Sequence, residues 1–313
     1  MKSAVVFSIS CAVLFGCGGS SVKTQQSKVP VVYMAGVEGY APSFWRDGVP
    51  TSWKDPSNKM ELTSLYVSGN DVYAAGSDKT GAKCWKNGLP IPLKFRWNEA
   101  SAKSICVSGP DVYVAGSERN LMQTFAVLWK NGERTQLTDG REWAEANAVA
   151  VSGGDVYVAG CEYIKGTPVT RCWRNGTQIE LSDSCGEVTA MYISGKDIYI
   201  CSNDWSYLKN GKLVALKVED GFIPSFASIC VSGTDVYVCG RMNTNAAYWK
   251  NGTMFLLSEG EIESGATSIA VVNGDVYVSG FAGDYAKCWK NGQSLPIQKK
   301  RVWSKANAIF IAQ

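Results

Sequence analysis

Histidine is absent from all 313 residues of the chain. This absence excludes the Ser-His-Asp and Cys-His mechanisms, and it removes the commonest general base and the commonest metal ligand. The glycine-rich phosphate-binding phrases and the G-x-S-x-G turn of hydrolases are also missing, as is any Cys-x-x-Cys spacing. Metal sites built only of carboxylates and carbonyls, chiefly for calcium, stay possible. We expect no cofactor and assign no catalytic or metal-binding residue.

Strong charge of one sign is lacking as well. The formal net charge is +3, charged residues make up 19% of the chain, and no Lys- or Arg-rich run occurs. Proteins that bind nucleic acid usually carry a much stronger basic patch or stripe. We therefore expect no nucleic-acid partner.

The first residues have the pattern of an export signal. Lys2 supplies a positive charge, and the apolar run from Ala4 to Phe15 is too short for a comfortable transmembrane helix. The phrase Leu14-Phe15-Gly16-Cys17 resembles a bacterial lipobox. That resemblance implies cleavage before Cys17 and attachment of lipid to its thiol. An ordinary signal peptide with a chance cysteine is the alternative.

These features predict three segments: a signal peptide at 1–16, the lipidated cysteine with a polar tether at 17–29, and a folded domain at 30–313. Acyl chains on Cys17 would hold the domain at a membrane. The expected location is the bacterial cell envelope, and the outer membrane if the host has one, because Gly18 rather than Asp follows the cysteine.

Two phrases recur along the folded domain. Val-Ser-Gly-x-Asp-Val-Tyr-Val-Ala-Gly and its variants occur seven times, with successive tyrosines 40, 40, 44, 42, 38 and 40 residues apart. Trp-Lys-Asn-Gly or a close variant follows each copy. A period near 40 in an all-β pattern is typical of propeller blades. Each repeat reads as four strands, which in the second repeat are 62–67, 71–76, 82–86 and about 89–95.

Turn chemistry and the chain ends support this reading. Gly-x or Asn-Gly pairs separate strands one and two, and Asn-Gly or Asp-Gly pairs separate strands three and four, as in two-residue β-hairpins. The chain enters at strand two (31–36) and ends on a segment (306–313) that matches strand one. We therefore predict an all-β, seven-bladed propeller of four-stranded antiparallel blades, closed by pairing of the last strand with the first blade.

The repeats resemble those of bacterial lipoproteins that carry Ser-Gly-x-Asp-Val-Tyr and Trp-Lys-Asn-Gly phrases, and they are distantly similar to kelch repeats. The resemblance covers about residues 31–313. The resemblance implies the fold and an envelope location, but it implies no biochemical activity.

Most of the conspicuous repeated residues are predicted to belong to the scaffold. The six tryptophans of the second phrase should pack between blades, and the aspartates of the first phrase should accept local backbone N–H bonds. Cysteines at equivalent blade positions are expected to be small buried residues. A disulfide between Cys161 and Cys185, or between Cys230 and Cys239, remains possible.

Function is expected on the face that carries the two–three and four–one loops, because these loops vary while the other hairpins are uniform. An Arg and a Trp recur before strand one in three blades. These candidate ligand-binding residues are Arg96, Trp97, Arg141, Trp143, Arg301 and Trp303. The competing interpretation is that they only pack between blades.

Three functions remain open from the sequence. The favoured one is a non-enzymatic envelope lipoprotein that binds an unknown protein or glycan. The alternatives are an envelope assembly factor and a histidine-free carbohydrate-active enzyme that uses a carboxylate pair.

Overall fold

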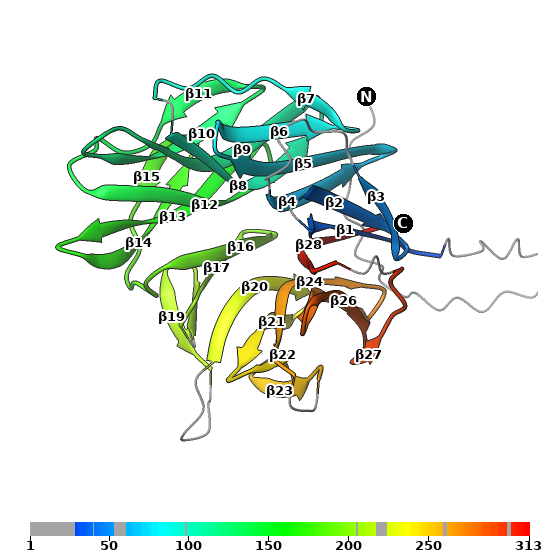
Figure 1. The fold of residues 1–313 in the computed structure, drawn as a ribbon. Helices are drawn as coiled ribbons and strands as arrows, with labels where there is room; N and C mark the ends of the chain where they lie inside the picture. The colour runs from blue at the N-terminus through cyan, green and yellow to red at the C-terminus, as the bar shows by residue number, and fades with distance from the viewer. Residues whose placement is uncertain are drawn as a thin grey trace, which may run out of the picture.

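The computed structural model describes residues 29–39, 41–52, 61–97, 99–204, 206–216, 224–258, 262–298 and 302–313. These residues form seven four-stranded antiparallel sheets, arranged as the blades of a propeller (Figure 1). The predicted fold is confirmed. The described part of the chain has no helix long and apolar enough to cross a membrane. Cys17 and the expected signal peptide lie outside the described residues.

Each blade has four strands, which follow one another from the centre of the ring outward. Blade 1 consists of β28 (Ser304–Ala312), β1 (Val31–Glu38), β2 (Ala41–Arg46) and β3 (Val49–Ser52). Blade 2 consists of β4 (Glu61–Ser68), β5 (Asp71–Asp78), β6 (Gly81–Lys86) and β7 (Leu89–Ile91). Blade 3 consists of β8 (Glu99–Ser108), β9 (Asp111–Arg119), β10 (Thr124–Lys130) and β11 (Glu133–Gln136). Blade 4 consists of β12 (Trp143–Ser152), β13 (Asp155–Ile164), β14 (Thr167–Arg174) and β15 (Thr177–Ile179).

The remaining three blades repeat this order. Blade 5 consists of β16 (Val188–Ser194), β17 (Asp197–Ser202), β18 (Ser206–Lys209) and β19 (Lys212–Ala215). Blade 6 consists of β20 (Pro224–Ser232), β21 (Asp235–Met242), β22 (Asn245–Lys250) and β23 (Thr253–Leu256). Blade 7 consists of β24 (Ser264–Val272), β25 (Asp275–Ala282), β26 (Tyr285–Lys290) and β27 (Gln293–Ser294).

Ring closure occurs in blade 1, where the last strand pairs with the first. β28 lies antiparallel to β1, with Val31 opposite Ala312 and Glu38 opposite Ser304. This pairing removes the free inner edge of β1, as the complementary chain ends predicted. The fourth strand of blade 2 is shorter than expected, because it ends at Ile91. Pro92 follows and has no N–H to continue the ladder.

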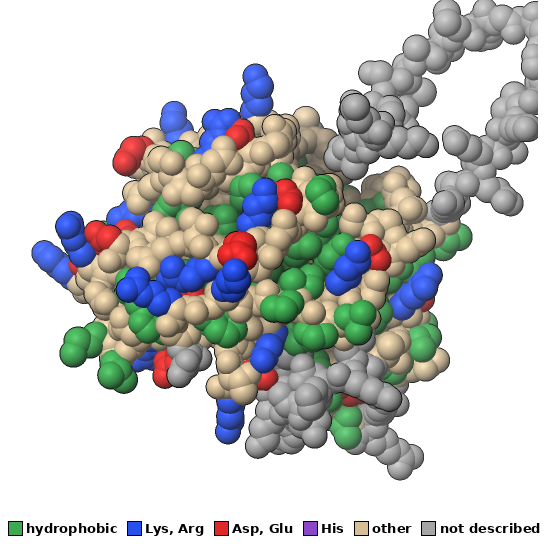
Figure 2. Space-filling view, turned by 90° about the horizontal axis from the view of Figure 1, so that it is seen from above, with side chains coloured by type: hydrophobic (Ala, Val, Ile, Leu, Met, Phe, Trp, Pro, Cys, Tyr) green, Lys and Arg blue, Asp and Glu red, His purple; other side chains and the backbone are tan. Residues whose placement is uncertain are grey.

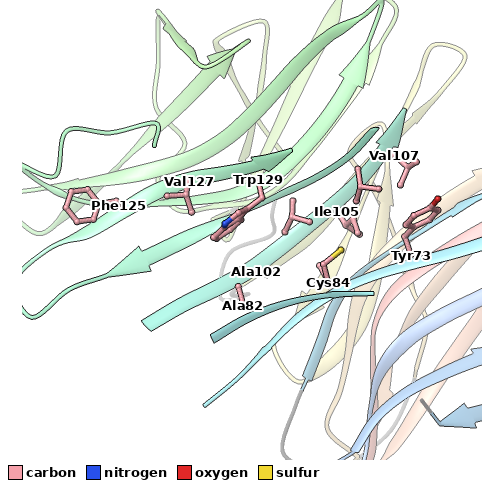
Figure 3. Close-up of a cluster of buried hydrophobic side chains, with 12 residues drawn as sticks. Tyr73, Ala82, Cys84, Ala102, Ile105, Val107, Phe125, Val127 and Trp129 are labelled. Atoms are coloured by element: carbon pink, nitrogen blue, oxygen red, sulfur yellow. The ribbon is translucent and has the colours of Figure 1, made fainter. Parts of the chain in front are cut away.

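The cores lie between neighbouring blades. In the cluster shared by blades 2 and 3, Tyr73 and Cys84 of blade 2 face Ile105 and Trp129 of blade 3 (Figure 3). The six repeated tryptophans are at most 4% exposed, and Leu208 takes their place in blade 5. Their predicted packing role is confirmed. The repeated tryptophans are Trp45, Trp85, Trp129, Trp173, Trp249 and Trp289.

The nine cysteines of the described residues are all buried free thiols, so neither of the two open disulfides is present. Burial raises the pKa of Cys84 to about 12 and that of Cys161 to about 11. A thiol with such a pKa stays protonated at neutral pH and is a poor nucleophile. These cysteines therefore act as small packing residues.

Every inner strand carries a β-bulge, which the sequence pattern does not reveal. The bulge in β12 lies at Asn147, between Ala146 and Ala148. At four of the seven blade junctions the bulge side chain donates a hydrogen bond to a carbonyl of the next blade. These bonds are Thr63 Oγ1 to Ala102 O at 3.0 Å, Asn147 Nδ2 to Val188 O at 2.7 Å, Thr267 Oγ1 to Ala306 O at 2.6 Å and Asn307 Nδ2 to Leu62 O at 2.9 Å. The bulges thus link adjacent blades.

The bulges also account for the glycine that ends the first phrase. A Cβ on Gly116 would lie 1.8 Å from the carbonyl oxygen of Ser101, on the bulged inner strand. Only glycine permits such a close approach of two backbones. Blade 5 has Ser202 at this position, and its inner strand begins only at Val188.

The two repeated phrases meet inside each blade. In blade 3 the Asp111 carboxylate binds the Lys130 ammonium at 2.8 Å and accepts a 2.7 Å hydrogen bond from Asn131 Nδ2. Asn131 Oδ1 in turn accepts the backbone N–H of Val112. Blades 2 to 7 all contain this Asp–Asn–Lys/Arg cluster, which we call the clasp. The predicted scaffold role holds, but the partners of the aspartates are side chains rather than backbone N–H groups.

The clasps make the fold sensitive to acid. The bonds from Lys130 and Asn131 lower the pKa of Asp111 below its ordinary value of 3.8, and the five equivalent aspartates shift the same way. A carboxyl whose pKa is lower in the folded state stabilises the fold above its unfolded pKa and loses that contribution as the pH falls through the folded value. We expect the melting temperature to fall between about pH 5 and pH 2.

Thermal unfolding followed by circular dichroism across this range measures the effect. The double variant Asp111→Asn/Asp235→Asn should have a lower melting temperature than the wild type at pH 7. Its melting temperature should fall less than that of the wild type when the pH is lowered. Asp284→Asn, which changes an exposed aspartate outside the clasps, is the matched control. An acid profile of the double variant as steep as that of the wild type would show that other carboxyls govern acid stability.

Candidate functional site

The longest connection between strands two and three lies in blade 3, between β9 and β10. It spans four residues, Asn120 to Gln123, whereas the corresponding turn of blade 4 is the pair Lys165-Gly166. Its tip places Leu121 and Met122 in solvent, with 99% and 84% of their surface exposed. The sequence analysis missed this loop, although two adjacent apolar residues in a predicted loop are a signal for it.

Three adjoining hollows surround this tip on the face where function is expected. The first lies against Trp97, Glu99, Arg119 and the loop tip itself. The second extends across blades 2, 3 and 4, and it shares Glu99 and Arg119 with the first. The third shares Trp143 and Glu145 with the second, and it also borders Met122, Arg141 and Tyr163. Because their linings overlap, the hollows form one surface that we call the loop groove.

Trp143 is the most open aromatic residue of the loop groove. It begins β12 and has 52% of its surface exposed. The Arg119 guanidinium carbon lies 5.1 Å from the centre of the Trp143 ring, within the range of a cation–π contact. The Arg119 Nε atom also lies 3.9 Å from a Glu99 carboxylate oxygen. Arg119, which the sequence reasoning missed, therefore connects the loop groove across blades 3 and 4.

Trp97 lines the first hollow of the loop groove, and its ring is in contact with several neighbouring side chains. Its ring stacks on Phe125 with centroids 4.6 Å apart, and the guanidinium carbons of Arg96 and Arg134 lie 5.0 and 5.5 Å from its centre. Arg134 is fixed by a 2.7 Å bond to Glu118, whose side chain is fully buried. The packing interpretation therefore describes Trp97 and Arg96 best.

The other predicted residues divide between the loop groove and a distant blade. Arg141 borders the third hollow, and its Nε atom pairs with Asp139 at 3.2 Å. Trp303 is 46% exposed, but it precedes β28 in blade 1 and borders none of the three hollows. Arg301 lies outside the described residues. The structure thus brings Trp97, Arg141 and Trp143 to the loop groove, whereas Arg96 borders none of the three hollows.

Three carboxylates, those of Asp78, Glu99 and Glu145, border the same hollow. A glycoside hydrolase uses two carboxyl groups that flank the scissile bond. Arg119 lies beside Glu99, with its Nε atom 3.9 Å from a Glu99 carboxylate oxygen. Among the described residues, no group of three acidic or cysteine side chains has a geometry that could hold a metal ion.

Comparisons with known proteins support the fold, but they identify no family. No protein-family model and no curated protein matches the chain. The solved WD40 β-propeller domain of Doa1 is similar, with 14% identity, a TM-score of 0.54, and coverage of 90% of this chain and 89% of that chain. This likeness supports a β-propeller.

Two weaker similarities carry no argument, because their TM-scores are below 0.5. The computationally designed Ika8 protein has 17% identity over 77% of this chain and 76% of its own, with a TM-score of 0.48. A chain of the nidogen/laminin complex has 10% identity over 90% of this chain and 98% of its own, with a TM-score of 0.46.

Proposed function

We propose that this protein is a non-enzymatic binding lipoprotein of the bacterial cell envelope, which recognises a protein or glycan ligand through the loop groove. The observation that carries the proposal is the continuity of the groove across the loops of blades 3 and 4. Rigid scaffolds commonly present binding residues on such loops. A propeller also suits this role, because its blades hold the loops in fixed positions.

The envelope location rests on the lipobox-like phrase at the N-terminus. Cys17 would carry the lipid, and the chain would bind membranes through its acyl groups. Replacing Cys17 with serine should abolish the uptake of labelled palmitate and move the protein out of the membrane fraction. Unchanged membrane sedimentation of Cys17→Ser would contradict the anchoring.

Binding is tested with the full chain purified from membranes in detergent. The probes are a glycan array and a displayed library of random linear peptides. We expect the wild type to bind a probe of one class and the double variant Arg119→Ala/Trp143→Ala to lose that binding. The absence of binding to both probe classes would overturn the proposed function.

A further inference from the structure

The β9–β10 loop is held rigidly in the conformation that exposes its apolar tip. Asn120 Oδ1 accepts hydrogen bonds of 2.8 Å from the backbone N–H groups of both Met122 and Gln123. The Gln123 side-chain amide donates to Gly140 O at 2.9 Å, which ties this loop to the β11–β12 connection. These hydrogen bonds therefore keep the side chains of Leu121 and Met122 exposed to solvent. Such preorganisation lowers the entropy cost of binding a partner.

The Trp97 ring offers little free surface to a sugar, and the half-exposed Trp143 ring has a guanidinium group close to it. Trp97 is stacked on Phe125 and flanked by two guanidinium groups. Trp143 has Arg119 close to its ring, 5.1 Å from the ring centre. A sugar bound by stacking needs an open aromatic face, and it gains little from the aliphatic side chains of Leu121 and Met122. Trp, Arg and Met are instead the residue types enriched at protein–protein interfaces.

The charges around the groove are mixed in sign. Arg119 lies beside Glu99, Arg141 pairs with Asp139, and Glu145 borders the same surface. On the face seen in Figure 2, basic and acidic side chains likewise lie near one another. A polyanionic glycan or an anionic bilayer would be matched by a basic surface without these carboxylates. The mixed rim around an apolar centre corresponds to the anatomy of a protein interface.

We propose that the ligand of the loop groove is a polypeptide segment, which buries aliphatic or aromatic side chains against Leu121, Met122 and Trp143. Its polar groups meet a rim of both charges formed by Arg119, Glu99 and neighbouring residues. This inference rests on the proposed function and narrows its ligand from protein or glycan to protein.

The experiment compares three probes. A displayed library of random linear peptides and a glycan array are applied to the full chain in detergent, and neutral or anionic phospholipid vesicles are applied to the Cys17→Ser chain without detergent. We expect selected peptides rich in aliphatic and aromatic residues. Leu121→Ser/Met122→Ser should weaken the binding of such a peptide at least about tenfold, as loss of interface anchors commonly does. Leu89→Ser, which changes another exposed leucine, on β7, is the matched control and should leave binding unchanged.

Each other outcome has a definite meaning. Glycan binding that survives Leu121→Ser/Met122→Ser but is lost in Trp143→Ala would overturn the polypeptide inference and leave the proposed function intact. Vesicle binding that depends on Leu121 and Met122 would assign the apolar tip to a lipid surface and overturn the inference as well. Binding to no probe would overturn both proposals. Equal loss of peptide binding in Leu89→Ser would show that the peptides do not bind in the groove.

Discussion

A chain that ends at Trp303, and so lacks β28, is expected to lose cooperative folding. β28 contributes the buried side chains of Ile309 and Ile311 to the cluster shared by blades 7 and 1. Burying one isoleucine side chain contributes about 1.5–3 kcal/mol, whereas the net stability of a domain is only about 5–15 kcal/mol. The truncation also removes the Asn307 bond to blade 2 and exposes the inner edge of β1.

Chemical denaturation followed by tryptophan fluorescence measures this loss. We expect no cooperative transition, or one with its midpoint far below that of the full chain. A chain shortened only by the exposed Gln313 should unfold like the wild type. Adding a synthetic peptide of residues 304–313 to the truncated chain should restore part of the transition. Unchanged cooperative unfolding of the truncated chain would show that β28 does not hold the ring closed.

The second large effect separates two tryptophans with different roles. Trp129 is fully buried between blades 2 and 3, and its Nε1 donates a 2.8 Å hydrogen bond to Lys94 O. Trp129→Ala should lower the free energy of unfolding by about 3–5 kcal/mol, because it leaves a large cavity. For a domain of this size the melting temperature should fall by roughly 6–15 °C. Trp143→Ala should change the stability by about 1 kcal/mol or less, because the side chain is half exposed.

Calorimetry and peptide titration of both variants provide the measurement. Below its melting temperature, Trp129→Ala should bind a selected peptide as the wild type does, whereas Trp143→Ala should bind at least about tenfold more weakly. Phe replacements at both positions test whether ring size is sufficient. A Trp143→Ala variant that is strongly destabilised and still binds would assign this residue to the scaffold.

The sequence predicted the scaffold because its signals are local and repeated. Asn87-Gly88 takes up positive φ angles of 52° and 79°, as a tight hairpin turn requires. Gly69 has a φ of 59°, whereas its turn partner Asn70 has no positive φ, which agrees with a leading-glycine turn. The match between the last segment and the other first strands predicted the pairing of β28 with β1.

The contacts between elements could not be predicted in the same way. Hydrophobic alternation does not show a one-residue bulge, so the bonds from Asn147 and Thr267 to the next blade were missed. The aspartates of the first phrase were expected to bind backbone groups, because their partners in the second phrase lie about 13 to 20 residues away. Strand pairing brings the two phrases together, with Tyr73 opposite Lys86.

The candidate site shows the same division. Composition and spacing placed Arg and Trp before the inner strands of three blades, but a spacing does not tell which side chains remain open. The structure covers Trp97 with Phe125, leaves Trp143 half exposed and adds Arg119 and the rigid Leu121–Met122 tip. The sequence by itself determined the blade count, the hairpins and the ring closure, because each depends on short-range turn chemistry and strand length. Only the tertiary structure decided the bulge links, the clasps and the loop groove, because each depends on side chains from strands and loops far apart in the chain.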